Sequence, residues 1–340
     1  MTTPNLAPTS SGDGVIVIDH LSKSFGSVRA VDDLSFTVRP GRVTGFLGPN
    51  GAGKTTTLRI LLGLVRASAG MATIGGRTYG QVSHPMRTVG AALEAASFHP
   101  GRSALDHLRV YAPQAGVSDV RCREVIDFVG LGPVADRRVG GFSLGMRQRL
   151  GVAASLLREP RLLVLDEPAN GLDPAGIRDM RALVKRLAAS GLTVLLSSHN
   201  MDEVEEICDN VTIMRTGDVV YHGTIDRLRE QAPQQAHRIK TSDDTAALVL
   251  GQAYPKLQIV AMDGALHARA DQAVIDGYVA RLVTAAQADV DTYVRALVAA
   301  GLALRGLSLT EEPLESLFFM LTETSPQSVP SAYESAGAVA

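Results

Sequence analysis

With 340 residues, the chain is long enough for about two domains and a sizeable buried core. Its 33 lysine and arginine residues nearly balance 35 aspartate and glutamate residues, so we expect neither a broad basic surface nor a nucleic-acid partner. Only two cysteines occur, far apart, and no apolar run reaches the roughly 18 residues that a membrane helix needs.

The chain divides by composition into four parts. Residues 1–14 are polar and carry no signal-peptide pattern, and residues 323–340 are small and polar, so both ends are predicted to be disordered tails. Strand and helix patterns alternate through residues 15–232, which predicts an α/β domain with a helical insertion at about residues 95–145. A composition rich in alanine and valine then predicts a small α/β accessory domain over residues 237–322.

An aromatic residue stands between the first two predicted strands. These strands are Val15–Ile18 and Leu34–Val38, and Phe25 lies among small residues in the turn-rich piece between them. Two interpretations of Phe25 are open at this point. It stacks on an adenine ring as an ATP-binding residue, or it closes the edge of a sheet as a packing residue.

The next stretch, Gly48–Thr56, organises the rest of the chain. It fits the pattern G-x-x-x-x-G-K-[ST] between a predicted buried strand, Arg42–Leu47, and a predicted helix, Thr55–Leu62. Glycines let successive backbone N–H groups turn toward a phosphate, and the helix dipole adds to that attraction. Lys54 suits the β- and γ-phosphates, and the Thr55 hydroxyl suits Mg²⁺. The predicted ATP-binding residues here are Gly48, Pro49, Asn50, Gly51, Ala52, Gly53, Lys54, Thr55 and Thr56.

A second candidate anion site follows the helical insertion. The run Val89–Leu93 is predicted to be a strand that ends at Glu94, and the segment after it is polar and helical. Ser143 and Gly145 then lie where another helix is predicted to begin, at Met146. Because helix N-termini attract anions, Ser143 and Gly145 are candidate ATP-binding residues.

Polar side chains follow two further predicted strands. Arg161–Leu165 has the pattern of a buried parallel strand and leads directly to Asp166 and Glu167. Carboxylates beyond the carboxyl end of such a strand lie where α/β sheets bind ligands. We expect Asp166 to hold Mg²⁺ together with Thr55, and Glu167 to polarise an attacking water. His199 ends the predicted strand Thr193–Ser198 at the same sheet edge, which favours a contact with the γ-phosphate.

The C-terminal part carries secondary structure but no recognisable chemical motif. Pro233–His237 is predicted to be a linker. The predicted strands are Arg238–Thr241, Leu257–Ala261, Ala265–Ala268 and Leu302–Leu309, and the predicted helices are Asp244–Gly251, Gln272–Gln287, Val290–Ala300 and Glu315–Leu321. This order predicts a domain close to a split β-α-β unit with an extra helix.

The order of the motifs resembles that of the ATP-binding subunits of ABC transporters, over about Val15–Arg229. The resemblance implies a P-loop NTPase fold of the ABC type, with ATP and Mg²⁺ as ligands. It implies that Phe25 stacks on adenine, that Asp166 and Glu167 form the Walker B pair, and that His199 is the switch histidine. The implied catalytic residues are therefore Glu167 and His199.

Two departures from the common family pattern narrow the resemblance. The family signature usually reads L-S-G-G-Q, whereas residues 142–146 read F-S-L-G-M, which keeps Ser143 and Gly145. The family's Q-loop glutamine corresponds to Glu94 here. Together with Phe98–Pro100, these departures look like those of bacterial exporters for drugs and for peptide antibiotics such as bacitracin and lantibiotics. The C-terminal segment is similar to an accessory domain that many of those subunits carry.

Glu94 carries a more specific expectation. An ionised glutamate only accepts hydrogen bonds and adds negative charge beside the phosphates, which costs energy unless a metal ion is close. We therefore expect Glu94 to approach Mg²⁺ or its waters when ATP is bound. The alternative is that Glu94 points to solvent and that its loop only contacts a membrane subunit.

The resemblance also implies an assembly. One P-loop and one signature segment per chain complete two sites only in a head-to-tail dimer, with ATP between Lys54 of one copy and Ser143 and Gly145 of the other. The expected partner is a membrane-spanning permease, which would hold the subunit at the cytoplasmic face of the membrane. The predicted function is ATP hydrolysis that powers export of a drug, a peptide antibiotic or a lipid-like molecule. The alternative is a soluble ABC-type ATP switch without a membrane partner.

Overall fold

The computed structural model describes residues 14–93, 98–232, 236–261, 281–284, 287–309 and 313–323. The chain divides into two compact units, residues 1–227 and residues 228–340, and each is described by itself. Most of the two predicted tails, residues 1–13 and 324–340, lies outside the described residues. Within the described ranges, no helix is both long and apolar enough to cross a bilayer.

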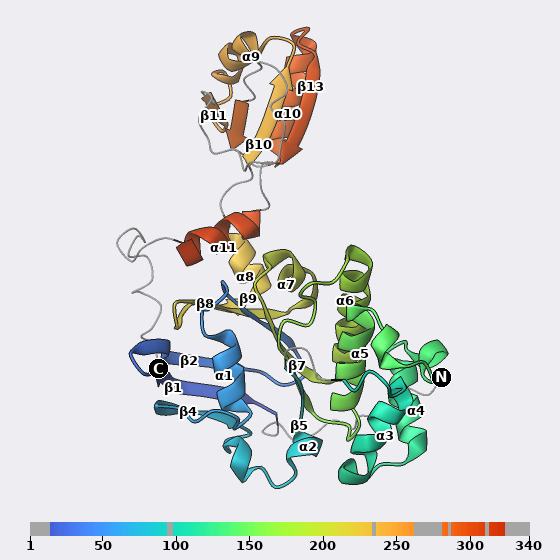
Figure 1. Ribbon diagram of the computed structural model, residues 1–340. Helices are drawn as coiled ribbons and strands as arrows, with labels where there is room; N and C mark the ends of the chain where they lie inside the picture. The colour runs from blue at the N-terminus through green and yellow to red at the C-terminus, as the bar shows by residue number, and fades with distance from the viewer. Residues whose placement is uncertain are drawn as a thin grey trace. The chain divides into compact units, whose positions relative to one another are not determined.

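A six-stranded sheet forms the centre of the N-terminal unit (Figure 1). Its strand order is β5-β6-β7-β3-β8-β9, and all neighbours are parallel except β8 and β9. Every residue of β3, β6 and β7 is buried, as expected for parallel strands covered on both faces. The strands are β3 (Val43–Leu47), β5 (Val89–Ala92), β6 (Leu162–Leu165), β7 (Thr193–Ser198), β8 (Asn210–Arg215) and β9 (Asp218–Thr224).

A three-stranded antiparallel sheet packs beside it. Its order is β2-β1-β4, with strands β1 (Ile16–Phe25), β2 (Val28–Val38) and β4 (Ala69–Ile74). Burial alternates along β2, so one face of this sheet turns to the core and the other to solvent. The rings of Phe36 on β2 and Phe46 on β3 lie 5.1 Å apart between centroids, which joins the two sheets in one core.

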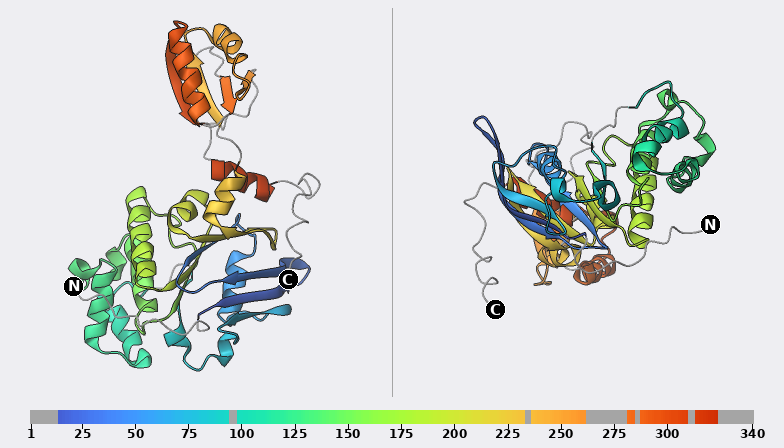
Figure 2. Two further views of the ribbon diagram at one scale, coloured as in Figure 1. Left: turned by 180° about the vertical axis from the view of Figure 1, so that it is seen from behind. Right: turned by 90° about the horizontal axis from the view of Figure 1, so that it is seen from below.

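Helices surround these sheets. The predicted helical insertion contains α3 and α4, and Figures 1 and 2 place both at the opposite end of the unit from β1, β2 and β4. Ser103 and Ser118 cap the two helices by accepting hydrogen bonds from backbone N–H groups three residues later. The α-helices are α1 (Lys54–Leu61), α2 (Pro85–Thr88), α3 (Ala104–Ala115), α4 (Asp119–Phe128), α5 (Leu144–Ser155), α6 (Pro174–Ala189), α7 (Met201–Ile207) and α8 (Ile225–Gln231), and short 3₁₀ helices cover Tyr79–Gln81, Gly132–Val134 and Val139–Gly141.

Two of these helices begin earlier than the sequence predicts. The sequence predicts one start at Met146 and, after a turn over Asn170–Pro174, another at Ile177. In the structure α5 begins at Leu144 and α6 at Pro174. In each case a polar residue directly before the helix caps its first turn, since Ser143 accepts from Met146 N at 3.3 Å and Asp173 accepts from Gly176 N at 2.9 Å. A glycine in the first turn of each helix hid the true start.

The C-terminal unit is built around a four-stranded antiparallel sheet in the order β11-β12-β10-β13. The order along the chain is β-α-β-β-α-β followed by one more helix, which is the ferredoxin-like arrangement. The elements are β10 (Ala236–Thr241), α9 (Asp244–Gly251), β11 (Gln258–Ala261), β12 (Arg281–Thr284), α10 (Gln287–Ala299), β13 (Leu304–Leu309) and α11 (Pro313–Glu323).

Three predictions in this unit need correction. The predicted helix Gln272–Gln287 is wrong over Arg281–Thr284, which form β12 because they pair with both β10 and β11. The predicted linker extended too far, since Ala236 and His237 already belong to β10. Glu323 belongs to α11 rather than to a tail. The predicted strand Ala265–Ala268 lies outside the described residues.

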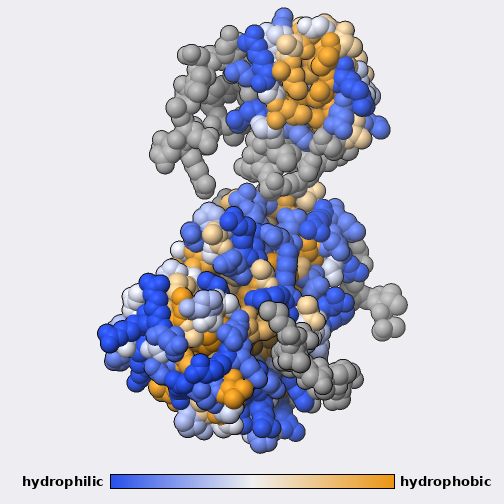
Figure 3. Space-filling view, turned by 90° about the vertical axis from the view of Figure 1, so that its right-hand side faces the viewer, coloured by the Kyte–Doolittle hydropathy of each residue, from blue (hydrophilic) through white to orange (hydrophobic). Residues whose placement is uncertain are grey.

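A small apolar core holds this unit together. Tyr293 on α10 is 2% exposed, and its hydroxyl donates a 2.6 Å hydrogen bond to the carbonyl oxygen of Ala247 on α9. That bond satisfies the only polar atom of a large buried ring. On the face drawn in Figure 3, hydrophobic residues gather over part of this unit, whereas hydrophilic residues predominate over the N-terminal unit. The buried core residues are Ile239, Ala247, Leu257, Val290, Tyr293 and Leu297.

Candidate active site

The candidate site lies at the carboxyl edge of the six-stranded sheet. Strand β3 pairs in parallel with β7, with Leu47 opposite Ser198, and β6 pairs in parallel with β7, with Leu165 opposite Leu196. The loops that follow β3, β6 and β7 therefore leave the sheet side by side. This edge is where open α/β sheets bind ligands.

The loop Gly48–Gly53 has a backbone that only glycine suits at two points. Gly51 and Gly53 have φ angles of 84° and 105°, in the left-handed region. A Cβ at Gly53 would lie 2.4 Å from the carbonyl oxygen of Ala30, so the β1–β2 hairpin and this loop approach too closely for any side chain there. Pro49, Asn50 and Gly51 are exposed, which leaves the loop open to a ligand.

Lys54 begins α1 and is 5% exposed. Its Nζ donates to the carbonyl oxygen of Gly48 at 2.6 Å and to that of Pro49 at 3.3 Å. It also forms an ion pair with Glu167, with 3.2 Å between Nζ and Oε1. A buried ammonium needs such partners, because taking an unpaired charge out of water is costly. Thr55 and Thr56 are half-buried in the first turn of the same helix.

Asp166 is a buried carboxylate with one unused oxygen. It is 3% exposed, and its Oδ1 accepts a hydrogen bond of 2.5 Å from the Ser197 hydroxyl on the neighbouring strand β7. Its Oδ2 has no hydrogen-bond partner among the described residues. A buried carboxylate oxygen without a donor is unfavourable unless a cation or a water completes it.

Glu167 contacts both Lys54 and His199. Its Oε1 pairs with Lys54, and its Oε2 lies 2.8 Å from Nδ1 of His199. Because an ionised carboxylate only accepts hydrogen bonds, this contact requires a proton on Nδ1. Glu167 has a φ of 48°, a left-handed conformation that costs about 1–2 kcal/mol for a residue other than glycine. The contacts of its carboxylate with Lys54 and His199 offset that cost.

The predicted signature residues lie at the start of α5. Ser143 is exposed and caps the helix, and Gly145 lies 3.6 Å, measured from a Cβ placed on it, from a Leu172 methyl group. No hydrogen bond or ion pair among the described residues joins Ser143 or Gly145 to the P-loop of the same chain. The structure thus brings together Lys54, Asp166, Glu167 and His199, but not Ser143 and Gly145.

Phe25 ends β1 in the hairpin beside the P-loop. Its residue surface is 52% exposed, and Nζ of Lys23 lies 4.7 Å from the centroid of its ring. A ring with half its surface in water is available for stacking. Glu94, the predicted metal-linked residue, lies outside the described residues.

Comparison with known proteins places this site in a family. The sequence pattern described as "ABC transporter" matches residues 31–170. The bacitracin transport ATP-binding protein BcrA of Bacillus licheniformis is 39% identical over 239 residues, which are 69% of this chain and 78% of that protein. The chain belongs to the ABC transporter ATP-binding proteins.

Further relatives agree with that placement. The lantibiotic transport ATP-binding protein SrtF of Streptococcus pyogenes is 37% identical over 206 residues, which are 61% of this chain and 89% of that protein. A solved ATP-binding subunit of an ABC transporter is 28% identical, with a TM-score of 0.57 over 64% of this chain and 92% of that one. The predicted family and the predicted α/β fold of the ABC type are confirmed, and this ABC subunit is an ATP-hydrolysing enzyme.

Sequence reasoning missed two residues that support the ABC site. Ser197 bonds to Asp166 and also accepts a 2.8 Å hydrogen bond from the backbone N–H of Glu167. Ser198 donates at 2.9 Å to Glu203 on α7, and burial raises the pKa of that carboxyl although this hydrogen bond opposes the rise. The sequence did contain a signal for them, because two polar residues follow an apolar run at the end of strand β7, which lies beside the strand that leads to Asp166.

Proposed function

We propose that this subunit binds Mg²⁺-ATP at the edge formed by β3, β6 and β7 and that Glu167 activates the water that attacks the γ-phosphate. The observation that carries the proposal is the chain of contacts from Lys54 through Glu167 to His199. Lys54 is a cation that can bind phosphate, Glu167 can act as the general base, and His199 can orient that base. Glu167 lies within hydrogen-bond distance of both other residues. This is the geometry that general-base catalysis needs.

The residues fit a magnesium ion. Asp166 offers a buried oxygen that none of the described residues contacts by a hydrogen bond. The half-buried Thr55 lies at the start of the helix that follows the P-loop. No cluster of three or more His, Cys, Asp or Glu side chains in metal-binding range occurs among the described residues, so ATP oxygens would complete the coordination. When bound, the ion would neutralise charge on the phosphates.

Because Lys54 and Glu167 form an ion pair, ATP binding would change the surroundings of the Glu167 carboxylate. The β- and γ-phosphates compete for the Lys54 ammonium, because they carry more charge than one carboxylate. When Lys54 turns to the phosphates, Oε1 of Glu167 loses its cation and becomes free to accept a proton from water. His199 keeps its contact with Oε2 and so holds the carboxylate in place.

A second copy of this chain would complete the site. Ser143 is exposed at the N-terminus of the 12-residue helix α5 and has no described contact with its own P-loop, which supports a role in a head-to-tail dimer. In that dimer, ATP would lie between Lys54 of one copy and Ser143 and Gly145 of the other.

Mixed dimers test this sharing of residues. We expect Ser143→Arg and Lys54→Ala each to abolish hydrolysis alone. A heterodimer of the two variants carries both changes at one composite site and neither at the other, so hydrolysis should reappear. Absence of recovery in purified heterodimers would contradict shared sites.

We further propose that the subunit powers a separate membrane permease at the cytoplasmic face of the membrane. The helical insertion exposes large apolar side chains on α3, with Val110 50% exposed and Tyr111 39% exposed. The named relatives support export of a drug, a peptide antibiotic or a lipid-like molecule, since one is a bacitracin and one a lantibiotic transport protein. A soluble ATP switch is the alternative, and it gives these exposed residues no partner.

Co-purification separates the two alternatives. The full chain should co-purify from detergent extracts with a membrane protein of several spans. Val110→Glu with Tyr111→Glu should abolish that association without reducing basal ATP hydrolysis. Val120→Glu on α4 is the matched control, because Val120 is also exposed, at 65%. Retention of the membrane protein by the α3 variant would remove this surface from the proposal.

A further inference from the structure

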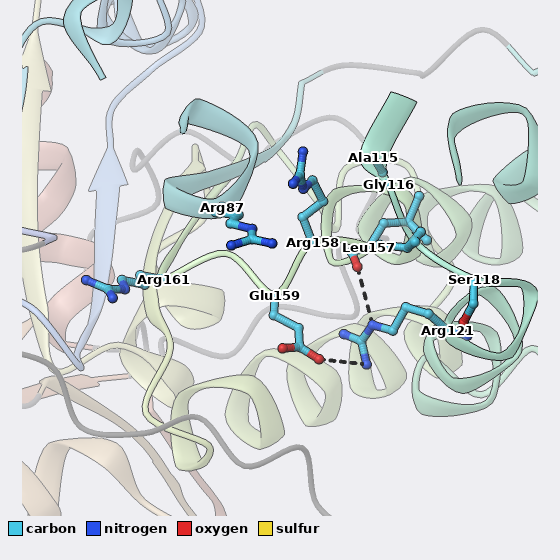
Figure 4. A pocket seen from close by; sticks show the side chains of 10 residues that line it. Arg87, Ala115, Gly116, Ser118, Arg121, Leu157, Arg158, Glu159 and Arg161 are labelled. Atoms are coloured by element: carbon cyan, nitrogen blue, oxygen red, sulfur yellow. Dashed lines mark hydrogen bonds and ion pairs between the residues drawn. The ribbon is translucent and has the colours of Figure 1, made fainter. Parts of the chain in front are cut away.

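A second polar hollow lies at the amino-terminal side of β5 and β6, away from the P-loop edge. It has a volume of about 510 Å³, within the range of pockets that hold small ligands. Elements of the sheet core and of the helical insertion both contribute to its wall (Figure 4). The lining residues are Arg87, Ala115, Gly116, Val117, Ser118, Arg121, Leu157, Arg158, Glu159 and Arg161.

The hollow carries an excess of positive charge. Four arginines and a single carboxylate line it, so the lining holds three net positive charges. Arg121 is already engaged, since it forms ion pairs with Glu124 at 3.1 Å and with Glu159 at 3.4 Å. It also donates to the carbonyl oxygens of Leu156 and Leu157 after α5. The pairing with Glu159 occupies the only carboxylate of the lining.

Two of the other arginines have no partner in the part of the chain that the structure describes. Arg87 on α2 and Arg158 after α5 have no side-chain hydrogen bond or ion pair among the described residues, and Figure 4 shows both beside the hollow. Guanidinium groups gathered without an anion repel one another, and each has five N–H donors that match phosphate oxygens. The N-terminus of the ten-residue helix α4, capped by Ser118, adds a partial positive charge to the same wall.

We propose that this arginine hollow binds a small phosphorylated ligand, such as a diphosphate or a phosphate ester. A phosphate group accepts bidentate hydrogen bonds from Arg87 and Arg158 and balances the excess charge. The backbone of Gly116–Ser118 borders the remaining space, which suits a compact anion better than a long peptide.

The position of the hollow connects it to the ATP site. The loop Leu156–Arg161 joins α5, which Ser143 caps, to β6, which leads to Asp166. The N–H of Arg161 also bonds to the carbonyl oxygen of Thr88 at the end of α2. A ligand in the hollow would therefore hold the helical insertion against the sheet core. This inference does not depend on the catalytic assignment of Glu167.

Pyrophosphate binding without Mg²⁺ tests the proposal on the full chain. The background is Lys54→Ala, which weakens phosphate binding at the P-loop. We expect saturable binding by calorimetry and a rise in Tm with pyrophosphate. Arg87→Gln with Arg158→Gln should weaken binding at least about tenfold and abolish the Tm rise. Arg66→Gln with Arg77→Gln, two exposed arginines outside the hollow, is the matched control and should change neither result.

The same variants also expose a folding defect if one exists. Without pyrophosphate, the Arg87→Gln, Arg158→Gln protein should keep or raise its Tm, because a repulsion is removed. Equal pyrophosphate affinity in the hollow and control variants would overturn the proposal, as would absence of saturable binding in the Lys54→Ala background. Binding of a hexaglutamate peptide in place of pyrophosphate would also overturn it.

Discussion

Ser197 offers the sharpest test of how the ABC site is held together. Its side chain is fully buried, and its hydroxyl donates to Asp166 Oδ1 and accepts from the Glu167 N–H. Ser197→Ala removes both bonds at once. The Asp166 carboxylate then has no hydrogen-bond donor on either oxygen among the described residues, because Oδ2 has none already.

The magnitude follows from these two losses. A hydrogen bond to an ionised group contributes about 1.5–3 kcal/mol, and a buried N–H left unpaired costs about 1–3 kcal/mol. Because the two bonds share one hydroxyl, the losses do not add fully, and we expect the free energy of unfolding to fall by about 3 kcal/mol. For a unit of this size, that corresponds to a Tm decrease of about 6–12 °C.

Hydrolysis should fall as well. The backbone N–H of Glu167 loses its anchor, and small displacements of a catalytic group cost about tenfold to a hundredfold in rate. The assays are thermal unfolding by circular dichroism and phosphate release at saturating Mg²⁺-ATP. Ser198→Ala is the control, since Ser198 is equally buried but bonds to the half-buried Glu203. Equal effects of the two substitutions on Tm and on hydrolysis would refute the positioning role of Ser197.

Three further substitutions test other parts of the account. Phe25→Ala should weaken ATP affinity by about 1–3 kcal/mol, with little change in rate at saturating ATP, and unchanged affinity would make Phe25 a packing residue. Glu94→Ala should raise the Mg²⁺ concentration for half-maximal hydrolysis with the permease present, and an unchanged titration would remove its metal role. His107 is buried, and its Nδ1 has no hydrogen-bond partner within the described part of the chain. Burial and, to a lesser extent, Arg102 lower the pKa of His107, so folding opposes its protonation. His107→Phe should therefore raise the free energy of unfolding by about 1 kcal/mol at pH 7.5 and by more at pH 5.5, measured with urea, whereas a constant difference would contradict that pKa.

The P-loop strand and helix were predictable because their constraints are local. The motif Gly48–Thr56 fixes backbone type residue by residue, and unbroken apolar runs such as Leu162–Leu165 occur only where both sheet faces are covered. Helix starts were harder to predict. Ser143 and Asp173 are N-caps, but each is followed within three residues by a glycine, which disfavours a helix.

Contacts between distant segments could not be predicted from the sequence. The Lys54–Glu167 ion pair and the Ser197–Asp166 bond join residues on separate loops, and nothing in the local sequence encodes their distances. The sequence pattern of Arg281–Thr284 predicts a helix. These residues form a strand because they pair with β10 and β11 on either side, and the local sequence does not contain that information.

Glu167 decides the central claim, because the site is proposed to work through its carboxylate. Glu167→Gln keeps the shape of the side chain but removes the basic oxygen that takes a proton from water. Steady-state phosphate release and ATP binding by calorimetry should be measured on the same purified variant. Retained ATP binding with hydrolysis lowered at least about a hundredfold is the predicted result. Hydrolysis near the wild-type rate would contradict the account.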